Sequence, residues 1–383
     1  MKNWKKLVSL ILAIATMLSL VACGNTTDDS ATTDDTSSAE VVVDENGIPE
    51  GLTLLTTEDG STPYDAKYTG YNGGSYEITL GHGSAEESKV NTAAKYFANN
   101  LLIRSNGKIV VNLFPANQLG DDREQAESTA LGNMDASFIG TGVTAGFLPA
   151  LNFGNMPWIF QDLESFGEFY DGEGGQYLAE EFAKNVNMVI GGWGALGWRQ
   201  QICSTKQLKT PADMKGIKTR CQQNTIHTAI FNGIGAVAVP MAAVEVYTGL
   251  QQGTIQGMDQ VLYAGREKRH DEVAPYWTIL NWGQDPLLLL MNKDTLNNFD
   301  EEARAIVEEE MVKWGIYDRS IAEDWDAKAM EEMKAGGVQF YYPTEEELQQ
   351  WKDEMRAVAY PTFQEMVGDE IYNKLMSMCD TNW

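Results

Sequence analysis

Hydrophobic and polar residues alternate with two different periods along the body of the chain. Tyr76–Gly81 (YEITLG) alternates apolar and polar positions as a strand does, and Glu87–Leu102 has apolar residues at helical spacing. A strand over 109–114, a helix over 122–131 and a strand over 135–139 follow in the same order. Because strands that alternate with helices favour parallel pairing, we predict a mostly parallel sheet covered by helices, with ligands at the carboxyl ends of its strands.

A second group of elements follows farther along the chain. Short strands are predicted over 199–203 and 216–221, and helices over 225–232 and 242–252. A glycine ends the second of these helices, and 254–258 reads as a further short strand. These elements predict a second sheet with its own helices, and the length of 383 residues is sufficient for two domains.

Two helices are predicted in the C-terminal part. Asp300 can cap a helix that runs to Ala335, with acidic residues in its first turn and two glycines after its end. Thr344 and Glu347 have the spacing of a capping box, which predicts another helix through Val358. The whole pattern predicts an α/β fold.

The first residues have the pattern of an export signal. Three lysines precede the uncharged apolar run Leu7–Ala22, which is short for a membrane-spanning helix, and small residues flank Cys23 on both sides. We therefore predict a lipoprotein signal peptide over 1–22 and a lipid on the thiol of Cys23. A signal anchor that is never cut is the alternative.

Residues 25–50 are rich in Asp, Thr and Ser, so they cannot bury enough apolar surface to fold. We predict that 23–74 form the lipidated cysteine and a disordered acidic tether between the lipid and the folded domain. The protein is thus expected outside the cytoplasm, anchored to the cell membrane by an N-terminal lipid.

Composition narrows the function classes. The chain has 55 acidic and 28 basic residues, a net charge of −27 and 43% hydrophobic residues. A sizeable core can form, whereas a nucleic-acid partner is excluded because phosphate backbones bind clustered Lys and Arg. The motifs HExxH, GxSxG and GxxxxGK[ST] are lacking, and the three histidines offer no metal pair at helical spacing. We expect no enzyme, no cofactor and no metal site.

Cysteine usage leaves the redox state open. Cys203, Cys221 and Cys379 form an odd set with no CxxC motif and no spacing suited to zinc. A disulfide between Cys203 and Cys221 requires their strands to pair, and free buried thiols are the alternative.

Three stretches of the chain resemble the solute-binding proteins of tripartite ATP-independent periplasmic (TRAP) transporters, the DctP-like family. They are the block from Ile78 to Glu124 with FPANQLGDDRE, the block ALGNMDASFIGTG (130–142) followed by MPWIF (156–160), and LKTPADMKGIKTR (208–220) followed by VPMAAVEVYTGLQQGTIQGMDQ (239–260). The resemblance runs from about Tyr76 to the C-terminus.

The resemblance implies a two-lobe fold of the periplasmic-binding-protein type, with crossing hinge strands and a long helix that spans both lobes. We expect lobe I to comprise 75–196 and 285–318, and lobe II to comprise 197–284 and 319–383. The resemblance also implies that the lobes close on a small organic anion and deliver it to the TRAP membrane permease subunits. We expect a monomer.

Arginine is the residue type suited to such a ligand, because a planar guanidinium binds a carboxylate through two parallel hydrogen bonds. By resemblance, Arg220 in GIKTR falls on the family's main carboxylate-binding arginine, and Arg199 in GWRQ falls on a second arginine of the site. Each could instead be an exposed or salt-bridged arginine.

Four further candidates rest on the resemblance and on their positions. His82 follows the first strand and could donate a hydrogen bond to a ligand, or it could be a satisfied structural histidine. Thr141 lies in the loop after the third strand. Gln260 stands where the family often has a ligand-contacting Asn, and Val261 replaces a common Pro. Trp198 could stack on a ligand or pack in the core.

Two rival functions stay open at this point. One is a binding module of a sensor or of an ABC-type system, and the other is an anchored hydrolase that uses an acidic pair such as Asp121 and Asp122. Neighbouring genes for two TRAP membrane subunits would favour transport. The identity of the organic acid does not follow from the sequence.

Overall fold

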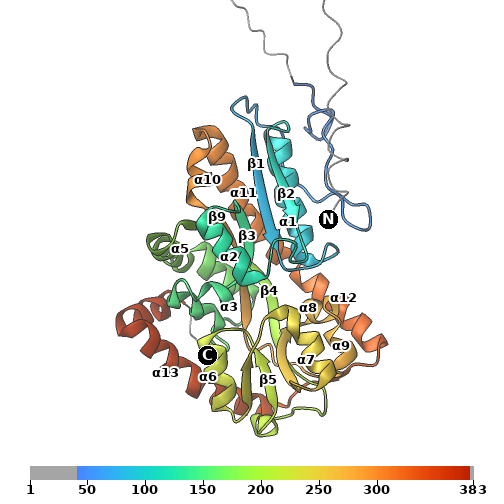
Figure 1. Cartoon of the computed structure of the whole chain (residues 1–383), viewed down its shortest axis with the longest axis vertical. Coiled ribbons are helices and arrows are strands. Elements are labelled where there is room, and N and C mark those ends of the chain that lie inside the picture. The colour runs from blue at the N-terminus through green and yellow to red at the C-terminus, as the bar shows by residue number, and fades with distance from the viewer. Residues whose placement is uncertain (1–40, 380–383) are drawn as a thin grey trace, which may run out of the picture. The chain divides into compact units, whose positions relative to one another are not determined.

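The computed structural model describes residues 41–379 (Figure 1). The predicted signal peptide over 1–22, the lipidated Cys23 and the tether as far as residue 40 lie outside the described residues. Within 41–379, no helix combines the length and the apolar character needed to cross a bilayer.

Residues 41–74 lie against the folded body, although the prediction assigned them to the disordered tether. Asn100, on helix α1 (Lys89–Arg104), accepts a hydrogen bond from the backbone amide of Asp65 at 3.1 Å through its side-chain oxygen. Tyr71 is buried in the core of the same half of the molecule. An acidic, polar segment can thus be held by side chains of a distant helix, which its own composition does not reveal.

The first half of the molecule is built on five strands. β1 (Tyr76–His82) lies between β2 (Ile109–Phe114) and β3 (Ala136–Gly140) and is parallel to both, as the strand–helix order predicts. β9 (Gln284–Asn292) runs antiparallel to β3 and to β4 (Met188–Cys203). The sheet of this half is therefore mixed, and only its outer strands, β2, β1 and β3, are parallel.

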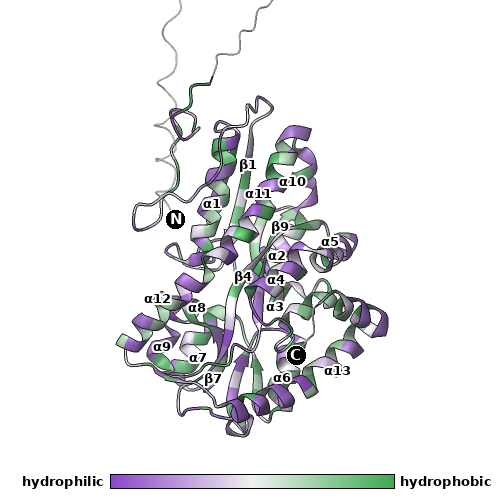
Figure 2. Cartoon of the chain, turned by 180° about the vertical axis from the view of Figure 1, so that it is seen from behind, coloured by the Kyte–Doolittle hydropathy of each residue, from purple (hydrophilic) through white to green (hydrophobic). Residues whose placement is uncertain are grey.

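Strand β9 was not predicted, and its burial explains why. All nine of its residues are buried, and the central PLLLLM is apolar throughout, without the alternation that marks a half-exposed strand. The surrounding helices, by contrast, alternate polar and apolar residues along their length (Figure 2).

The second half is built on five short strands and the end of β4. β5 (Lys218–Cys221) lies between β6 (Val237–Pro240) and β7 (Gly257–Val261) and is parallel to both. β8 (Tyr276–Thr278) pairs with β4, and β10 (Gln339–Tyr341) pairs with β8. The strand order through both halves is β2-β1-β3-β9-β4-β7-β5-β6.

Strand β4 joins the two halves. Its first part, Met188–Trp198, pairs with β9, and its last part, Arg199–Cys203, pairs with β7. The pairing register shifts between Ala195 and Trp198, and Gly197 there has φ +124°, a conformation that residues with a side chain rarely adopt. The predicted strand over 199–203 is thus the end of a much longer crossing strand with an irregular centre.

Helices cover both halves of the sheet (Figure 1). Besides α1 they are α2 (Asp122–Leu131), α3 (Thr141–Thr144), α4 (Leu163–Asp171), α5 (Glu173–Asn185), α6 (Thr225–Gly233), α7 (Val246–Gln252), α8 (Leu262–Glu267), α9 (His270–Val273), α10 (Lys293–Asn298), α11 (Glu301–Ser320), α12 (Ala322–Ala335) and α13 (Glu345–Met378). Helix α2 has the predicted bounds.

The single long helix predicted over 300–335 is present as two consecutive helices. Asp300 caps α11 as predicted, because its side chain accepts from the backbone amide of Ala303 at 2.8 Å. Ile321 alone separates α11 from α12. Helix α11 packs on β4 beside the first half, and α12 packs on α8 beside the second half.

The C-terminal helix α13 begins as predicted and ends much later. Thr344 and Glu347 form the capping box. The helix continues past the expected end at Val358 to Met378, with a non-helical residue at Gly368. It packs on α6 of the second half and also on α5 of the first half, so it contacts both halves.

The strand order bears on the disulfide between Cys203 and Cys221. β7 lies between β4 and β5, so the two cysteines are on strands about 9.5 Å apart, beyond the roughly 7 Å that a disulfide bridges between Cα atoms. Both are buried free thiols.

We expect alkylation without reductant to modify neither thiol in the native protein and both in denaturant, as located by peptide mass spectrometry. Unmodified Cys203 and Cys221 in denaturant would contradict this.

Candidate ligand-binding site

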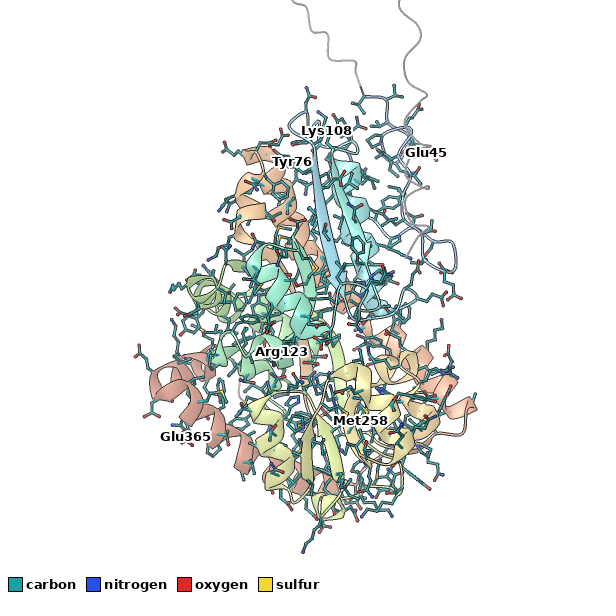
Figure 3. All side chains as sticks on the ribbon, viewed as in Figure 1. Glu45, Tyr76, Lys108, Arg123, Met258 and Glu365 are labelled. Carbon is teal, nitrogen blue, oxygen red and sulfur yellow. The ribbon has the colours of Figure 1, made fainter. Side chains whose placement is uncertain are left out.

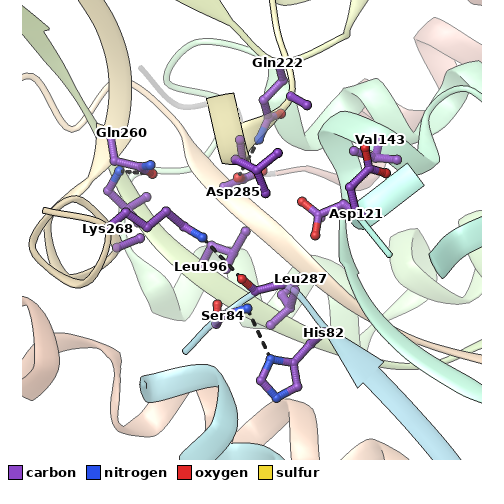
Figure 4. A pocket seen from close by; sticks show the side chains of 18 of the residues that line it. His82, Ser84, Asp121, Val143, Leu196, Gln222, Gln260, Lys268, Asp285 and Leu287 are labelled. Carbon is purple, nitrogen blue, oxygen red and sulfur yellow. Dashed lines mark hydrogen bonds between the residues drawn. The ribbon is translucent and has the colours of Figure 1, made fainter. Parts of the chain in front are cut away.

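A cavity lies between the two halves, next to the carboxyl ends of β1, β3 and β5 (Figure 4). This is the edge at which the strand–helix order predicts a ligand. In Figure 3, the labelled Arg123 lies in the region where the two halves face each other. The charged and amide side chains of the wall come from both halves and are Asn117, Asp121, Asp122, Arg123, Arg199, Arg220, Gln222, Gln223, Gln260, Lys268 and Asp285.

Arg220 is a buried cation of this wall without an ion-pair partner among the described residues. Strand β5 places it there, and only 5% of the residue is exposed. Its Nε donates to the carbonyl oxygen of Met241 at 3.1 Å, and no hydrogen bond or ion pair joins its terminal amino groups to any residue of 41–379. Burial lowers the pKa of Arg220, but a guanidinium stays protonated in proteins. Two parallel donors are therefore available to a carboxylate.

Arg199 lines the same cavity but is already paired. Its two terminal amino groups form buried ion pairs with Asp259, at 2.5 Å, and with Asp285. Burial raises the pKa of Asp259, but Arg199, with His227 and Arg220 nearby, holds that pKa below its usual value. Arg199 thus compensates two buried carboxylates, and each of its terminal amino groups already donates to one of them.

His82 and Gln260 also reach the cavity wall. The His82 ring lies within hydrogen-bond distance of Asn91 Oδ1, at 3.0 Å through Nε2, and of the Ser84 amide, at 3.3 Å through Nδ1. Burial lowers the pKa of His82 to about 4, so the ring is neutral. Both ring nitrogens are occupied inside the protein, whereas the Gln260 side-chain nitrogen has no hydrogen-bond partner among the described residues.

Thr141 and Trp198 are not part of the cavity wall. Thr141 is buried at the start of α3, where its hydroxyl donates to Asn155 Oδ1 at 3.4 Å, and the preceding Gly140 lines the cavity instead. Trp198 packs against the apolar core of the molecule. The structure thus brings four of the six expected ligand-contact residues together.

Asp122 and Lys268 line the cavity but were not among the expected ligand contacts, and Asp122 was considered only as part of the acidic pair of a hydrolase. Burial in the cleft raises the pKa of Asp122, against the effects of Lys268 and Arg220. Lys268 follows α8, and its Nζ donates to the carbonyl oxygen of Gly83 at 3.4 Å. Asp122 lies in the FPANQLGDDRE motif and Lys268 in none of the quoted motifs, and the approach of the two residues depends on how distant segments face each other.

The neutral His227 predicts a pH dependence of stability. It is fully buried beside Trp282, and both ring nitrogens are without partners among the described residues. Burial lowers its pKa from 6.5 to about 3, and the unfolded chain therefore binds a proton that the folded one rejects between these values. The stabilising contribution is present above pH 6.5 and is lost as pH falls toward 3.

We expect His227→Phe to flatten this loss by up to about 1.4 kcal/mol per pH unit between pH 6 and 4. Urea unfolding of the wild type and the variant at several pH values measures the difference. Two parallel curves of unfolding free energy against pH would contradict the prediction.

Two α/β halves joined by a crossing strand, with a charged cavity between them, define a binding protein of the periplasmic type. The chain belongs to the bacterial extracellular solute-binding proteins of family 7 (DctP), whose family profile matches residues 80–365. It is a TRAP-type periplasmic solute-binding protein, and the family predicted from the sequence motifs is confirmed.

Several relatives have named ligands. The chain is 31% identical over 258 residues to a solute-binding protein of Verminephrobacter eiseniae, covering 67% of this chain and 76% of that one. It is 28% identical to the 2,3-diketo-L-gulonate-binding periplasmic protein YiaO of Escherichia coli, covering 68% and 80%. It is also 28% identical to the C4-dicarboxylate-binding periplasmic protein DctP of Rhodobacter capsulatus, covering 70% and 80%.

Solved structures share the fold. A TRAP periplasmic solute-binding protein of Sulfurospirillum deleyianum with bound succinate is 27% identical, with a TM-score of 0.74, covering 80% of this chain and 99% of that one. A similar protein of a Sulfitobacter species with bound β-D-galacturonate is 24% identical, with a TM-score of 0.75, covering 79% and 99%. The two-lobe α/β architecture predicted from the resemblance is therefore confirmed.

Proposed function

We propose that this chain captures a small organic acid in the cavity between its lobes and delivers it to the membrane subunits of a TRAP transporter. The proposal depends mainly on Arg220. A guanidinium that is 5% exposed and forms no ion pair among the described residues is compensated only at longer range, by Asp259 and Asp122. A ligand carboxylate supplies a direct ion-pair partner, together with two acceptors for the terminal amino groups.

The other polar groups of the wall favour an acid that also has hydroxyl groups. Asp122 can accept a hydrogen bond from a hydroxyl, and the Gln260 amide can donate one. Relatives bind 2,3-diketo-L-gulonate or C4-dicarboxylates, and similar structures hold galacturonate, galactonate or succinate. Sugar acids are thus the first ligands to test, and succinate is the second.

Capture requires the lobes to move relative to each other. We place lobe I at 75–196 and 285–318, and lobe II at 197–284 and 319–383. The irregular centre of β4, between Ala195 and Trp198, supplies the hinge. A ligand that contacts both lobes favours the closed state, which lets the permease distinguish the loaded from the empty protein.

The N-terminal pattern supports the proposal that the mature protein is a lipoprotein held at the membrane through Cys23, and we propose further that it is a monomer. Replacement of Cys23 by alanine then releases the protein from the membrane fraction. Retention of that variant in the membrane would indicate an uncut signal anchor instead.

A thermal-shift screen of C4 dicarboxylates, sugar acids, keto acids and aromatic acids, followed by calorimetry, tests the binding function. We expect one class to raise the melting temperature and to bind with a stoichiometry of one. Incubation of the same acids with the protein, followed by product analysis, tests the hydrolase alternative. Turnover of any of them would overturn the proposal.

A further inference from the structure

The loop after β1 presents two backbone groups to the opposite lobe. Within its own lobe, the carbonyl oxygen of Ser84 accepts from the amide of Ala116 at 2.7 Å, and that of Ala85 accepts from the Ser88 hydroxyl at 2.6 Å. The carbonyl oxygen of Gly83 and the amide of Ala85, in contrast, bond to residues of the second half. The loop is thus a fixed surface against which the other lobe closes.

Two consecutive residues at the end of α8 make these contacts. Glu267 accepts from the Ala85 amide at 2.6 Å, and its second carboxylate oxygen is buried without a partner among the described residues. Lys268 donates to the Gly83 carbonyl oxygen. The Glu267 contact holds the end of α8 against the loop, and Lys268 makes its own, separate contact with the loop.

Lys268 has hydrogen-bonding capacity left over. The distance of 3.4 Å to the Gly83 oxygen is long, and no carboxylate of residues 41–379 forms an ion pair with Lys268. An ammonium group has three donors, so at least two of them remain available. Figure 4 shows the Lys268 side chain reaching toward Ser84, while Gln222, which follows β5, lies on another side of the cavity.

Lys268 and Arg220 act on the same enclosed space. Both line the cavity, and both lower the pKa of Asp122, which burial and Asp121 raise. Asp122 thus lies within electrostatic reach of both cations. One cation comes from the end of β5 and the other from the end of α8, so the two line the cavity from different elements of the second half.

We propose that Lys268 is a second ligand-binding cation and determines specificity for acids with a second oxygen acceptor remote from the carboxylate. This inference rests on the proposed function, in which Arg220 holds the carboxylate. The remote acceptor is a hydroxyl, a keto oxygen or a second carboxylate. Acids with an apolar far end leave the Lys268 ammonium group without an acceptor as the lobes close.

Calorimetry with D-glucuronate, D-galacturonate, D-galactonate, succinate and butyrate tests the inference, because only butyrate lacks the remote oxygen. We expect the wild type to bind at least one of the first four acids and to bind butyrate far more weakly. Lys268→Met should weaken the bound probe by about 10- to 100-fold, the range of a hydrogen bond to a charged group. Lys215→Met removes an equal charge at an exposed position outside the cavity wall and should change nothing.

Glu267→Ala separates ligand contact from lobe closure, because it removes the Ala85 contact and keeps the ammonium group. It should weaken all bound probes alike, whereas Lys268→Met should also reduce the preference for the oxygen-bearing probe over butyrate. Unchanged affinity in Lys268→Met, or wild-type affinity for butyrate equal to that for the other acids, overturns the inference and leaves the proposed function intact. Failure of the wild type to bind any organic acid overturns the proposed function, and this inference fails with it.

Discussion

Arg220→Ala is expected to abolish most of the affinity for whichever of D-glucuronate, D-galacturonate, D-galactonate or succinate the wild type binds. Loss of one partner of a buried charge pair costs about 2–5 kcal/mol, which corresponds to a roughly 30-fold or larger increase in Kd. We expect Arg199 to compensate little for the loss, because its charge is already balanced by two carboxylates. Isothermal calorimetry at constant ionic strength measures the change.

A matched control for this prediction is Arg304→Ala. Arg304 lies outside the cavity wall, and its ion pair with Glu308 at 2.9 Å is on the partly exposed surface of α11. This variant should bind as the wild type does. Wild-type affinity in a folded Arg220→Ala protein, as judged by circular dichroism, would refute the assignment of Arg220 as the carboxylate-binding residue.

Lys89→Met is expected to be the most destabilising of the substitutions considered, with a loss of about 3–5 kcal/mol in the free energy of unfolding. Lys89 and Asp318 form an ion pair at 2.7 Å, and neither side chain is exposed. The same carboxylate oxygen accepts from the Ala195 amide at 2.9 Å, next to the irregular centre of β4. Removal of the ammonium group leaves a buried carboxylate without its cation. Urea unfolding measures the loss.

Two variants show whether the buried charge is responsible. Lys184→Met breaks an exposed ion pair with Glu181 and should leave the midpoint of unfolding unchanged. The double variant Lys89→Met, Asp318→Leu removes both charges and should recover part of the loss. A single variant as stable as the wild type would mean that the pair does not stabilise the junction of α1, α11 and β4.

Local sequence patterns predicted the elements whose burial is one-sided. β2 and α2 have the predicted bounds, since the first alternates toward one face and the second carries its own capping residues. β9 was missed because both of its faces are covered, and most of β4 was missed because it is glycine-rich and buried as it crosses between the halves. The positions of these two strands depend on packing partners far away in the sequence.

The candidate site was also predicted only in part. Arg220, Arg199, Gln260 and His82 were named from motifs and line the cavity, whereas Thr141 and Trp198 do not. The prediction of Thr141 misses the cavity wall by one residue, because Gly140 lines the cavity and the chain turns into α3 directly after it. Side-chain direction at such a turn depends on backbone geometry that a motif does not specify.

By itself, the sequence determined the family and the order of most strands and helices, and it predicted an export signal and Arg220 as the carboxylate-binding residue. Only the tertiary structure decided which charges are free. It pairs Arg199 with Asp259 and Asp285, residues 60 and 86 positions away, and it brings Lys268 to a loop 185 positions earlier. Sequence periodicity reports on local conformation and one-sided burial, whereas the pairing of charges depends on which distant strands and loops become neighbours when the chain folds.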